Sequence, residues 1–289
     1  KRIIILIPVY NDWDSLKKLI NEINENIKDF IDISFECLII NDASTISIPE
    51  IVKPSKFISI EILNMRENKG HARCNAFGIR YIEQNEKFDY VILMDGDGED
   101  RPEEIKLFIE NFNYHPNKTI VGERVKRSES ILFKICYFFH KILTYTFTGR
   151  SIKFGNYTCL TKSTIEKMLS DKATWSSFSG SLAKNCNDKA TISSERGKRY
   201  FGPSKMSFLN LIKHSLAIIG VFKFSVLVRS ILFVLVYMFL TYQKISFIMI
   251  LPVIFTVIFL ISTFIISQRG SLDEMNNSLS NILIIDKII

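Results

Sequence analysis

The sequence predicts an α/β fold with an open sheet of mainly parallel strands, followed by two membrane-spanning helices. Three observations support this prediction. Continuous apolar runs alternate with segments of helical periodicity through the first hundred residues. Each apolar run ends abruptly in polar residues, as buried parallel strands do at their carboxyl ends. The chain from residue 222 to residue 267 is almost wholly apolar, about twice the length that one helix needs to cross a bilayer.

Four strands are expected at residues 3–7, 35–40, 57–63 and 90–94, each of them a short apolar run. An amphipathic helix is expected between the first two strands, because apolar side chains recur at helical spacing in residues 13–30. Another helix should follow the third strand. Strand, helix and strand in alternation, joined by right-handed crossovers, define an open α/β sheet. In such a sheet the ligand binds beyond the carboxyl ends of the strands.

The fourth strand leads into four carboxylates within six residues: Asp95, Asp97, Glu99 and Asp100. Asp95 and Asp97 could direct their oxygens at one hard divalent cation such as Mg²⁺ or Mn²⁺. A solvated acidic turn is the alternative. The site is favoured because polar residues that follow the other strands should gather at the same edge of the sheet: Tyr10, Asp42 and Asn75.

The apolar stretch divides into one span at about residues 225–242 and a second at about residues 245–267, joined by a short turn. Pro252 would kink the second span, which membrane helices tolerate. A buried hairpin of a soluble protein is the alternative. It is disfavoured because so few charged or amide residues interrupt the stretch: Lys223, Arg229, Gln243 and Lys244.

The formal net charge is +7, and basic residues gather before the first span: Lys205, Lys213, Lys223 and Arg229. By the positive-inside rule, the N-terminal domain and the C-terminal tail are expected on the cytoplasmic side. No basic stripe is interleaved with aromatic residues, so no nucleic-acid partner is expected. The five cysteines are scattered and odd in number, which indicates a reducing compartment. We expect no signal peptide, so that the spans themselves would target the protein.

Four short motifs occur in order along the first hundred residues: Pro8-Val9-Tyr10-Asn11, Asn41-Asp42-Ala43-Ser44, Asn68-Lys69-Gly70 through Asn75 and Gly78, and Asp95-Gly96-Asp97. Together they resemble the nucleotide-sugar domain of family 2 glycosyltransferases. The resemblance implies a Rossmann-like GT-A sheet. It also implies a nucleotide diphosphate sugar as the donor.

Longer motifs resemble the polyprenyl-phosphate sugar synthases, the group that includes dolichyl-phosphate mannosyltransferase. They are residues 95–103, the loop of residues 122–124 with Arg127, and residues 199–205 before an apolar helix. The resemblance implies an undecaprenyl or dolichyl phosphate as acceptor, and a bacterial inner membrane as the location. Two positions depart from the pattern. Glu99 stands where the family often has glutamine, and Thr158 or Cys159 stands where it usually has arginine.

The resemblance also implies roles for individual residues. Asp95, Asp97 and Glu99 would bind Mg²⁺ or Mn²⁺, and Asp95, Asp97 and Arg124 would be catalytic. The remaining residues would bind the donor or the phosphates of donor and acceptor: Pro8, Tyr10, Asn11, Asp42, Asn75, Asp95, Arg199, Ser204 and Lys205. Among these, Asp42 would hold the base or ribose, and Tyr10 would pack on the base.

The acceptor can also be argued from residues 172–187, which contain no aspartate or glutamate. A sugar hydroxyl needs a general base to take its proton, whereas a polyprenyl phosphate is already an anion. The lipid phosphate would attack opposite the leaving diphosphate and invert the anomeric centre. Two alternatives remain: a membrane-tethered enzyme that adds sugar to a hydroxyl of a glycan or glycolipid in cell-surface polysaccharide synthesis, and a non-catalytic membrane scaffold.

The expected organisation has four parts: a catalytic domain at residues 1–205, an amphipathic juxtamembrane helix at 206–223, a transmembrane hairpin at 224–268 and a cytoplasmic tail at 269–289. A homo-oligomer is expected.

Overall fold

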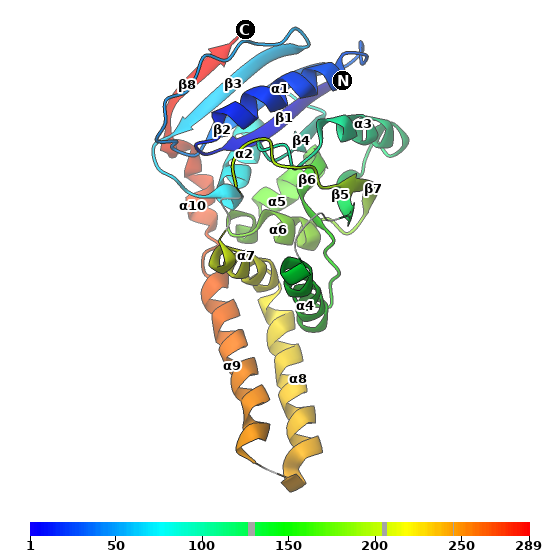
Figure 1. The fold of residues 1–289 in the computed structure, drawn as a ribbon, viewed down its shortest axis with the longest axis vertical. Coiled ribbons are helices and arrows are strands. Elements are labelled where there is room, and N and C mark those ends of the chain that lie inside the picture. Colours follow the sequence, from blue (N-terminus) through cyan, green and yellow to red (C-terminus); the bar gives the residue numbers. More distant parts are fainter. Residues whose placement is uncertain (127–130, 204–206, 245) are drawn as a thin grey trace.

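The fold is built on one eight-stranded mixed sheet with strand order β7-β5-β6-β4-β1-β2-β3-β8 (Figure 1). The structure is a computed structural model that describes residues 1–126, 131–203, 207–244 and 246–289. The strands are β1 (Arg2–Val9), β2 (Ser34–Asn41), β3 (Phe57–Met65), β4 (Tyr90–Leu93), β5 (Thr119–Lys126), β6 (Phe154–Thr161), β7 (Lys189–Glu195) and β8 (Ile282–Ile288).

Ten α-helices lie within the described residues: α1 (Trp13–Ile27), α2 (His71–Asn85), α3 (Ile105–Tyr114), α4 (Ile131–Thr148), α5 (Lys162–Leu169), α6 (Phe178–Asn185), α7 (Phe208–Gly220), α8 (Lys223–Thr241), α9 (Phe247–Ser267) and α10 (Leu272–Asn276). Four short 3₁₀ turns complete the described helical structure: η1 (Pro102–Glu104), η2 (Lys172–Trp175), η3 (Tyr242–Lys244) and η4 (Ser278–Asn281).

The four strands expected from the sequence pair in parallel. Ile5 of β1 lies opposite Cys37 of β2 and Ile92 of β4, and β2 in turn pairs with β3. The prediction of an open α/β sheet is confirmed. Because these strands run in one direction, their carboxyl ends meet at the same edge, where the acidic loop after β4 begins.

Successive side chains of the central strands point to opposite faces, and each face has its own helices. Ile3, Ile5 and Ile7 of β1 pack with α1 and α3 in one core cluster. Ile4 and Leu6 pack with α2, α5 and α6 in the other. This alternation explains why the strands are continuously apolar, since a strand covered on both faces buries every side chain.

The last twenty residues differ from the expected tail. Residues 272–288 form α10, η4 and β8, and β8 pairs antiparallel with the edge strand β3. The pairing is reinforced by the Asn64 amide, which donates to Asp286 at 2.8 Å, and by an ion pair of Lys287 with Glu61. The chain therefore leaves the sheet domain after β7, forms the hairpin and returns to complete the same sheet.

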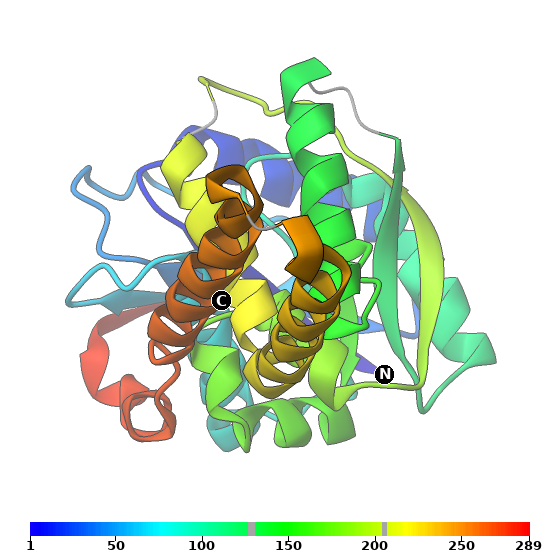
Figure 2. The same cartoon turned by 90° about the horizontal axis from the view of Figure 1, so that it is seen from below.

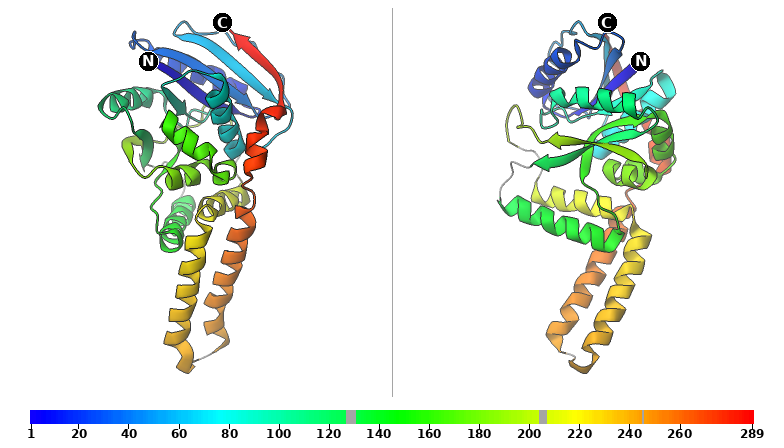
Figure 3. Two further views of the ribbon diagram at one scale, coloured as in Figure 1. Left: turned by 180° about the vertical axis from the view of Figure 1, so that it is seen from behind. Right: turned by 90° about the vertical axis from the view of Figure 1, so that its right-hand side faces the viewer.

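Helices α8 and α9 run side by side away from the sheet domain (Figures 1 and 3). Both are long and apolar enough to cross a membrane, with mean hydropathy of 2.2 and 2.8. Their large side chains face outward: within α8 only Val226 and Ser230 are buried. This exposure disfavours the buried hairpin of a soluble protein, because a soluble surface rarely carries so large an apolar patch.

Two further helices, α4 and α7, contact each other and the hairpin at its junction with the sheet domain. They lie across the base of that domain, as the views from below and from the side show (Figures 2 and 3). A small apolar cluster of Phe147, Ile219, Val226 and Phe259 joins all four helices. A helix, α7, lies within residues 206–223, where a juxtamembrane helix was expected, whereas α4 was not predicted.

Candidate functional site

The acidic loop after β4 is held in shape by Asp100, which is only 2% exposed. One oxygen of Asp100 accepts a hydrogen bond from the Asp95 backbone N–H at 2.9 Å, and the other faces Arg124 of β5 at 3.2 Å. Asp97 Oδ1 accepts from the Glu99 backbone N–H at 3.0 Å. The loop thus fixes Asp95 and Asp97 beside each other before any ligand is bound.

Each carboxylate of the loop has a basic partner. The pairs are Asp95 with His71 at 3.2 Å, Asp97 with Arg199 at 2.7 Å, Asp100 with Arg124 at 3.2 Å, and Glu99 with Arg196. Three of these four partners come from outside the β4 loop and β5. The loop is therefore a centre of negative charge on which several parts of the chain converge.

Crowding of the carboxylates shifts their pKa values in opposite directions. Burial, together with the charge of Asp95, raises the pKa of Asp97 to about 6 and that of Asp100 to about 7. Burial acts in the same direction on Asp95, but His71, Arg124 and Arg196 together outweigh it and hold the pKa of Asp95 well below its usual range. Asp95 is consequently the carboxylate that carries the negative charge most firmly.

The donor set fits a divalent cation at Asp95 and Asp97. Asp95 Oδ1 is buried and accepts no hydrogen bond from the described residues. The negative charges of Asp95 and Asp97 repel each other. A cation bound between the two carboxylates would relieve this repulsion. Glu99 is turned toward Arg196. In the part of the chain that the structure describes, no three side chains of His, Cys, Asp or Glu already form a metal-binding group, so substrate oxygens would complete the coordination.

A strap of residues 196–201 lies against the acidic loop. Its backbone donates from Gly197 to the Glu99 carbonyl at 2.8 Å and from Tyr200 to the Asp97 carbonyl at 3.0 Å. Arg199 of the strap bridges Asp97 to Asp12, at the start of α1. Arg199 therefore pairs with the loop in this structure, where the sequence suggested a phosphate contact. Two other residues expected to bind phosphate, Ser204 and Lys205, lie outside the described residues, and so does Arg127.

The residues expected to hold the nucleotide lie beyond the ends of β1 and β2. Pro8 is buried at the end of β1, and its carbonyl lies beside Gly96 of the acidic loop. Tyr10, directly after β1, is 41% exposed. Asn11 has a left-handed backbone (φ 51°), and its Oδ1 accepts from the Thr45 backbone N–H at 2.8 Å. Asn11 thus ties the two strand ends together.

Asp42 has a structural role that the sequence did not specify. It is buried, and its two oxygens accept from the backbone N–H groups of Lys69 and Gly70 at 2.7 and 2.9 Å. Burial raises the pKa of Asp42, and these two amides partly offset the effect. Asp42 therefore anchors the start of α2, and a base or ribose would have to use the remaining lone pairs of the carboxylate.

Two residues at the site were missed at the sequence level, His71 and Asn156. The amide nitrogen of Asn156 lies 2.7 Å from His71 Nε2, and that of Asn75 lies 3.3 Å from it. Thr158 and Cys159 are fully buried in β6. Asn156 of this strand instead contacts His71 beside the acidic loop. The position of His71 directly after the Asn-Lys-Gly motif was the available signal.

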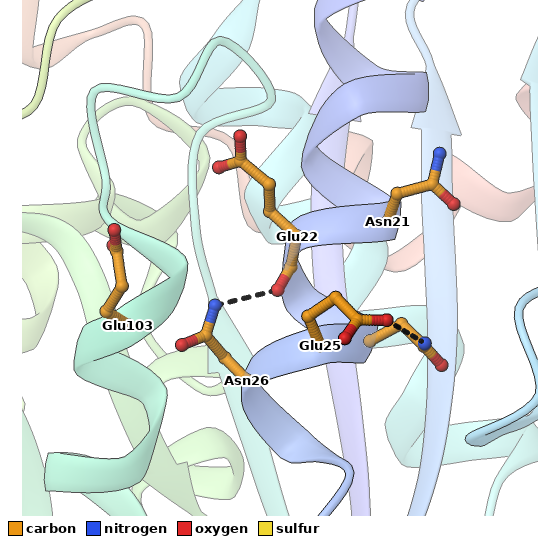
Figure 4. Close-up of a pocket in the computed structure, with 6 residues that line it drawn as sticks. Asn21, Glu22, Glu25, Asn26 and Glu103 are labelled. Carbon is orange, nitrogen blue, oxygen red and sulfur yellow. Dashed lines mark hydrogen bonds between the residues drawn. The ribbon is translucent and has the colours of Figure 1, made fainter.

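A separate pocket of about 520 Å³ lies between α1 and η1 (Figure 4). Its described lining consists of glutamates and asparagines: Asn21, Glu22, Asn24, Glu25, Asn26 and Glu103. Figure 4 shows the Asn26 amide donating to the Glu22 carbonyl, a contact of 2.8 Å within α1. Among the residues that the structure describes, no lysine or arginine and no predicted site residue lines this pocket, and its described lining does not suit a phosphate.

A sheet of this kind, with an acidic loop at the carboxyl edge of its parallel strands, is typical of transferases that use nucleotide sugars. Comparison with known proteins supports this assignment. Residues 4–165 match the model of glycosyl transferase family 2. This chain belongs to that family, as the motifs of the sequence predicted.

Curated relatives share part of the chain. Undecaprenyl-phosphate 4-deoxy-4-formamido-L-arabinose transferases of Salmonella choleraesuis and Salmonella paratyphi B are each 29% identical over 225 residues. The alignment covers 73% of this chain and 64% of each relative's own length.

Solved structures share the fold. Staphylococcus aureus TarS 1–349 in complex with UDP-GlcNAc has a TM-score of 0.54 at 14% identity, covering 97% of this chain and 92% of that one. Glucosyl-3-phosphoglycerate synthase from Mycobacterium tuberculosis, in complex with Mn²⁺, UDP and glucosyl-3-phosphoglycerate, has a TM-score of 0.54 at 11% identity. That match covers 78% of this chain and 80% of the synthase. The GT-A type of sheet is therefore confirmed.

Proposed function

We propose that this chain transfers a sugar from a nucleotide diphosphate sugar to a polyprenyl phosphate at a membrane surface. The observation that carries the proposal is the similarity to transferases named for undecaprenyl phosphate, over 73% of the chain. Two helices with the length and composition of membrane spans support it, because a polyprenyl acceptor is held in a membrane.

The chain's own residues would divide the work between donor and acceptor. Asp95 and Asp97 would hold Mg²⁺ or Mn²⁺, which when bound would offset the negative charge that develops on the departing diphosphate. Arg124 would act through Asp100, whose second oxygen fixes the Asp95 backbone. Tyr10 and Asn11, at the exposed end of β1, would border the base. Glu99 remains a candidate third ligand only if it leaves Arg196.

The acceptor side is proposed to lie toward α4 and α7. Both helices expose large apolar side chains at the junction with the hairpin, including Phe138, Phe139 and Tyr145 of α4 and Phe208 and Leu209 of α7. Helices of this kind lie in the interface between the headgroups and the acyl chains. They would keep the lipid phosphate at the level of the sheet domain, and Arg199 and Lys205 are proposed to bind that phosphate. Attack opposite the diphosphate would invert the anomeric centre.

The side of the membrane is proposed from charge. Lys213, Lys223 and Arg229 lie at the sheet-domain end of the hairpin, and Lys244 lies at its far turn. The positive-inside rule then places the catalytic domain in the cytoplasm. We also propose that the catalytic domain includes α10 and β8, and that the protein is a homo-oligomer.

The second candidate, transfer to a sugar hydroxyl, needs a general base near the acceptor. Residues 172–187 form η2 and α6 and offer none. Asp171, at the edge of this stretch, pairs with Lys184 at 2.7 Å and accepts from the Ala173 backbone N–H at 3.0 Å. These contacts lower its pKa against the opposing effect of burial, which makes it a weak base. No described contact thus favours the hydroxyl reaction.

The test is product analysis with the purified chain in detergent. We expect that a nucleotide diphosphate sugar and undecaprenyl phosphate together give an acid-labile sugar-phosphate lipid, seen by mass spectrometry. The Asp97→Asn variant should give almost none. An acid-stable glycoside formed on a glycan or glycolipid hydroxyl, with no lipid-phosphate product from any donor, would contradict the proposal and support the second candidate.

A further inference from the structure

We propose that His71 is a third protein ligand of the divalent cation at Asp95 and Asp97. The inference rests on the proposed function, since it assumes that the acidic loop binds a metal. It adds a residue that lies outside the acidic loop, at the first position of α2. The chemical class of the ligand is a divalent first-row or alkaline-earth cation, with Mn²⁺ preferred.

The spacing of the two facing atoms fits one cation. His71 Nε2 lies 3.2 Å from Asp95 Oδ1. In an octahedral site with bonds of about 2.1 Å, adjacent ligand atoms lie at right angles and are about 3 Å apart. The observed separation is therefore that of two neighbouring ligands, with little movement required of either side chain.

The carboxylate oxygen that faces the ring accepts no hydrogen bond from any other described residue. Asp95 Oδ1 is buried and accepts no hydrogen bond from the residues described. A divalent cation held between this oxygen and His71 Nε2 would satisfy the oxygen.

Two side-chain amides approach the ring at Nε2. Asn156 and Asn75 bring their amide nitrogens to 2.7 and 3.3 Å from Nε2. Asn75 is 1% exposed, and its own Oδ1 has no described partner, so a buried polar group lies unsatisfied beside the ring. Because an amide nitrogen only donates, these contacts mark Nε2 as a ring nitrogen that presents its lone pair, and a bound cation would take the place of the amides.

The backbone that carries His71 is also fixed. Asp42 binds the N–H groups of Lys69 and Gly70 and so sets the start of α2. Gly70 has φ 85°, a conformation that favours glycine and directs the chain into the helix. His71 is therefore presented to Asp95 by a rigid element, as an effective ligand must be.

A third ligand has a consequence for metal choice. Glu99, the carboxylate expected from the sequence, pairs with Arg196. If an imidazole takes its place, the site gains affinity for Mn²⁺ relative to Mg²⁺, because nitrogen ligands suit transition metals and Mg²⁺ prefers oxygen. The histidine would thus act as a specificity-determining residue for the cation.

The experiment measures Mn²⁺ bound to the purified full chain, without donor or acceptor, by electron paramagnetic resonance. We expect pulsed spectra to show nitrogen coupling to Mn²⁺, with the pattern changing when the protein carries ¹⁵N-histidine. His71→Asn should remove the coupling, weaken Mn²⁺ binding by about tenfold or more and lower the preference for Mn²⁺ over Mg²⁺. His115→Asn is the matched control, since His115 is exposed at the end of α3, and it should change nothing.

The outcomes separate the inference from the proposed function. Mn²⁺ that binds, and is lost in Asp97→Asn, but shows no histidine coupling in the labelled wild-type protein would overturn the role of His71 alone. Wild-type protein that binds no Mn²⁺ would overturn both the role of His71 and the metal-dependent part of the proposed function. The isotope measurement needs no substitution, so it decides the matter even if His71→Asn fails to fold.

Discussion

Asp97 lies in an electrostatically unfavourable position beside Asp95 in the acidic loop. Burial and the nearby charge of Asp95 raise its pKa, while Arg199 provides a counter-charge at 2.7 Å. A bound cation would compete with Arg199 for the same oxygen. If the proposed cation binds, Asp97 would exchange its pairing with Arg199 for a contact with the metal.

We predict that Asp97→Asn lowers turnover about 100-fold or more, because removing a charge that holds the metal removes stabilisation of the departing diphosphate. The thermal unfolding temperature should change little, since the side chain lies at the edge of the sheet and keeps its hydrogen bond to the loop in the amide form. A chelator should abolish wild-type activity, and Mg²⁺ or Mn²⁺ should restore it. Steady-state kinetics of lipid-linked product formation measure both effects.

Asp188→Asn is the control for this prediction, because Asp188 is an exposed carboxylate that pairs with Lys118 far from the loop in sequence. Its kinetics should match the wild type. Full wild-type activity in excess chelator would contradict metal use altogether.

At the residue scale, the sequence predicted which side chains gather but not how they pair. Asp95, Asp97 and Asp42 follow parallel strands, and the sheet brings the ends of such strands to one edge. The pairing of His71 with Asp95 and of Arg199 with Asp12 depends on loop conformations and tertiary contacts. The spacing of apolar residues along the sequence does not reveal loop conformations or tertiary contacts.

At the scale of elements, the strap of residues 196–201 fits the acidic loop closely. Gly98 has φ 85°, and a Cβ there would lie 2.5 Å from the Tyr200 ring. The Tyr200 hydroxyl in turn reaches Glu22 of α1. The strap thus depends on the absence of a side chain at Gly98.

We predict that Gly98→Ala loosens the strap. The added methyl would clash with Tyr200, and alanine is strained at this φ, which together cost about 1–3 kcal/mol. Limited digestion with trypsin should cut faster at Arg196, Lys198 and Arg199, and mass spectrometry of the fragments measures the rate.

Gly202→Ala is the matched control. Gly202 also has a positive φ, 67°, but an added Cβ would meet nothing within 4 Å. The backbone strain is therefore similar while the clash is missing. Equal acceleration of cleavage in both variants would show that the contact with Tyr200 does not hold the strap.

The C-terminal strand β8 was not predicted from the sequence. Residues 282–289 form an apolar run, but a short run far from its partner does not reveal which edge it joins. In the structure β8 extends the sheet beyond β3, and Ile62 lies opposite Asp286. The hairpin helices, by contrast, were predicted to within a few residues, because a long apolar stretch needs no partner to be recognised.

At the scale of the whole molecule, β8 constrains the membrane topology. Residues 282–288 pair with β3, so the chain after α9 must lie on the same side as the sheet domain. Helices α8 and α9 lie side by side, and the turn between them is at the far end of the molecule (Figure 1). If the two helices span a membrane, that turn is the part of the described chain that emerges on the opposite side.

We predict opposite labelling of the turn and of the chain after the hairpin. A cysteine at Gln243, exposed in the turn, should react with an impermeant maleimide only from outside the cell. Cysteines at Asn277 and at Glu25, both exposed on the sheet-domain side, should react only in inverted vesicles. The described cysteines are buried, which limits background, and Cys136 is replaced by serine in all variants.

Glu25 is the control for the orientation of the domain. If cysteines at Gln243 and Asn277 were labelled from the same side of the membrane, α8 and α9 would not both span it. Labelling of Glu25 from outside would instead keep the hairpin but reverse the proposed side, because β8 ties Asn277 and Glu25 to the same compartment.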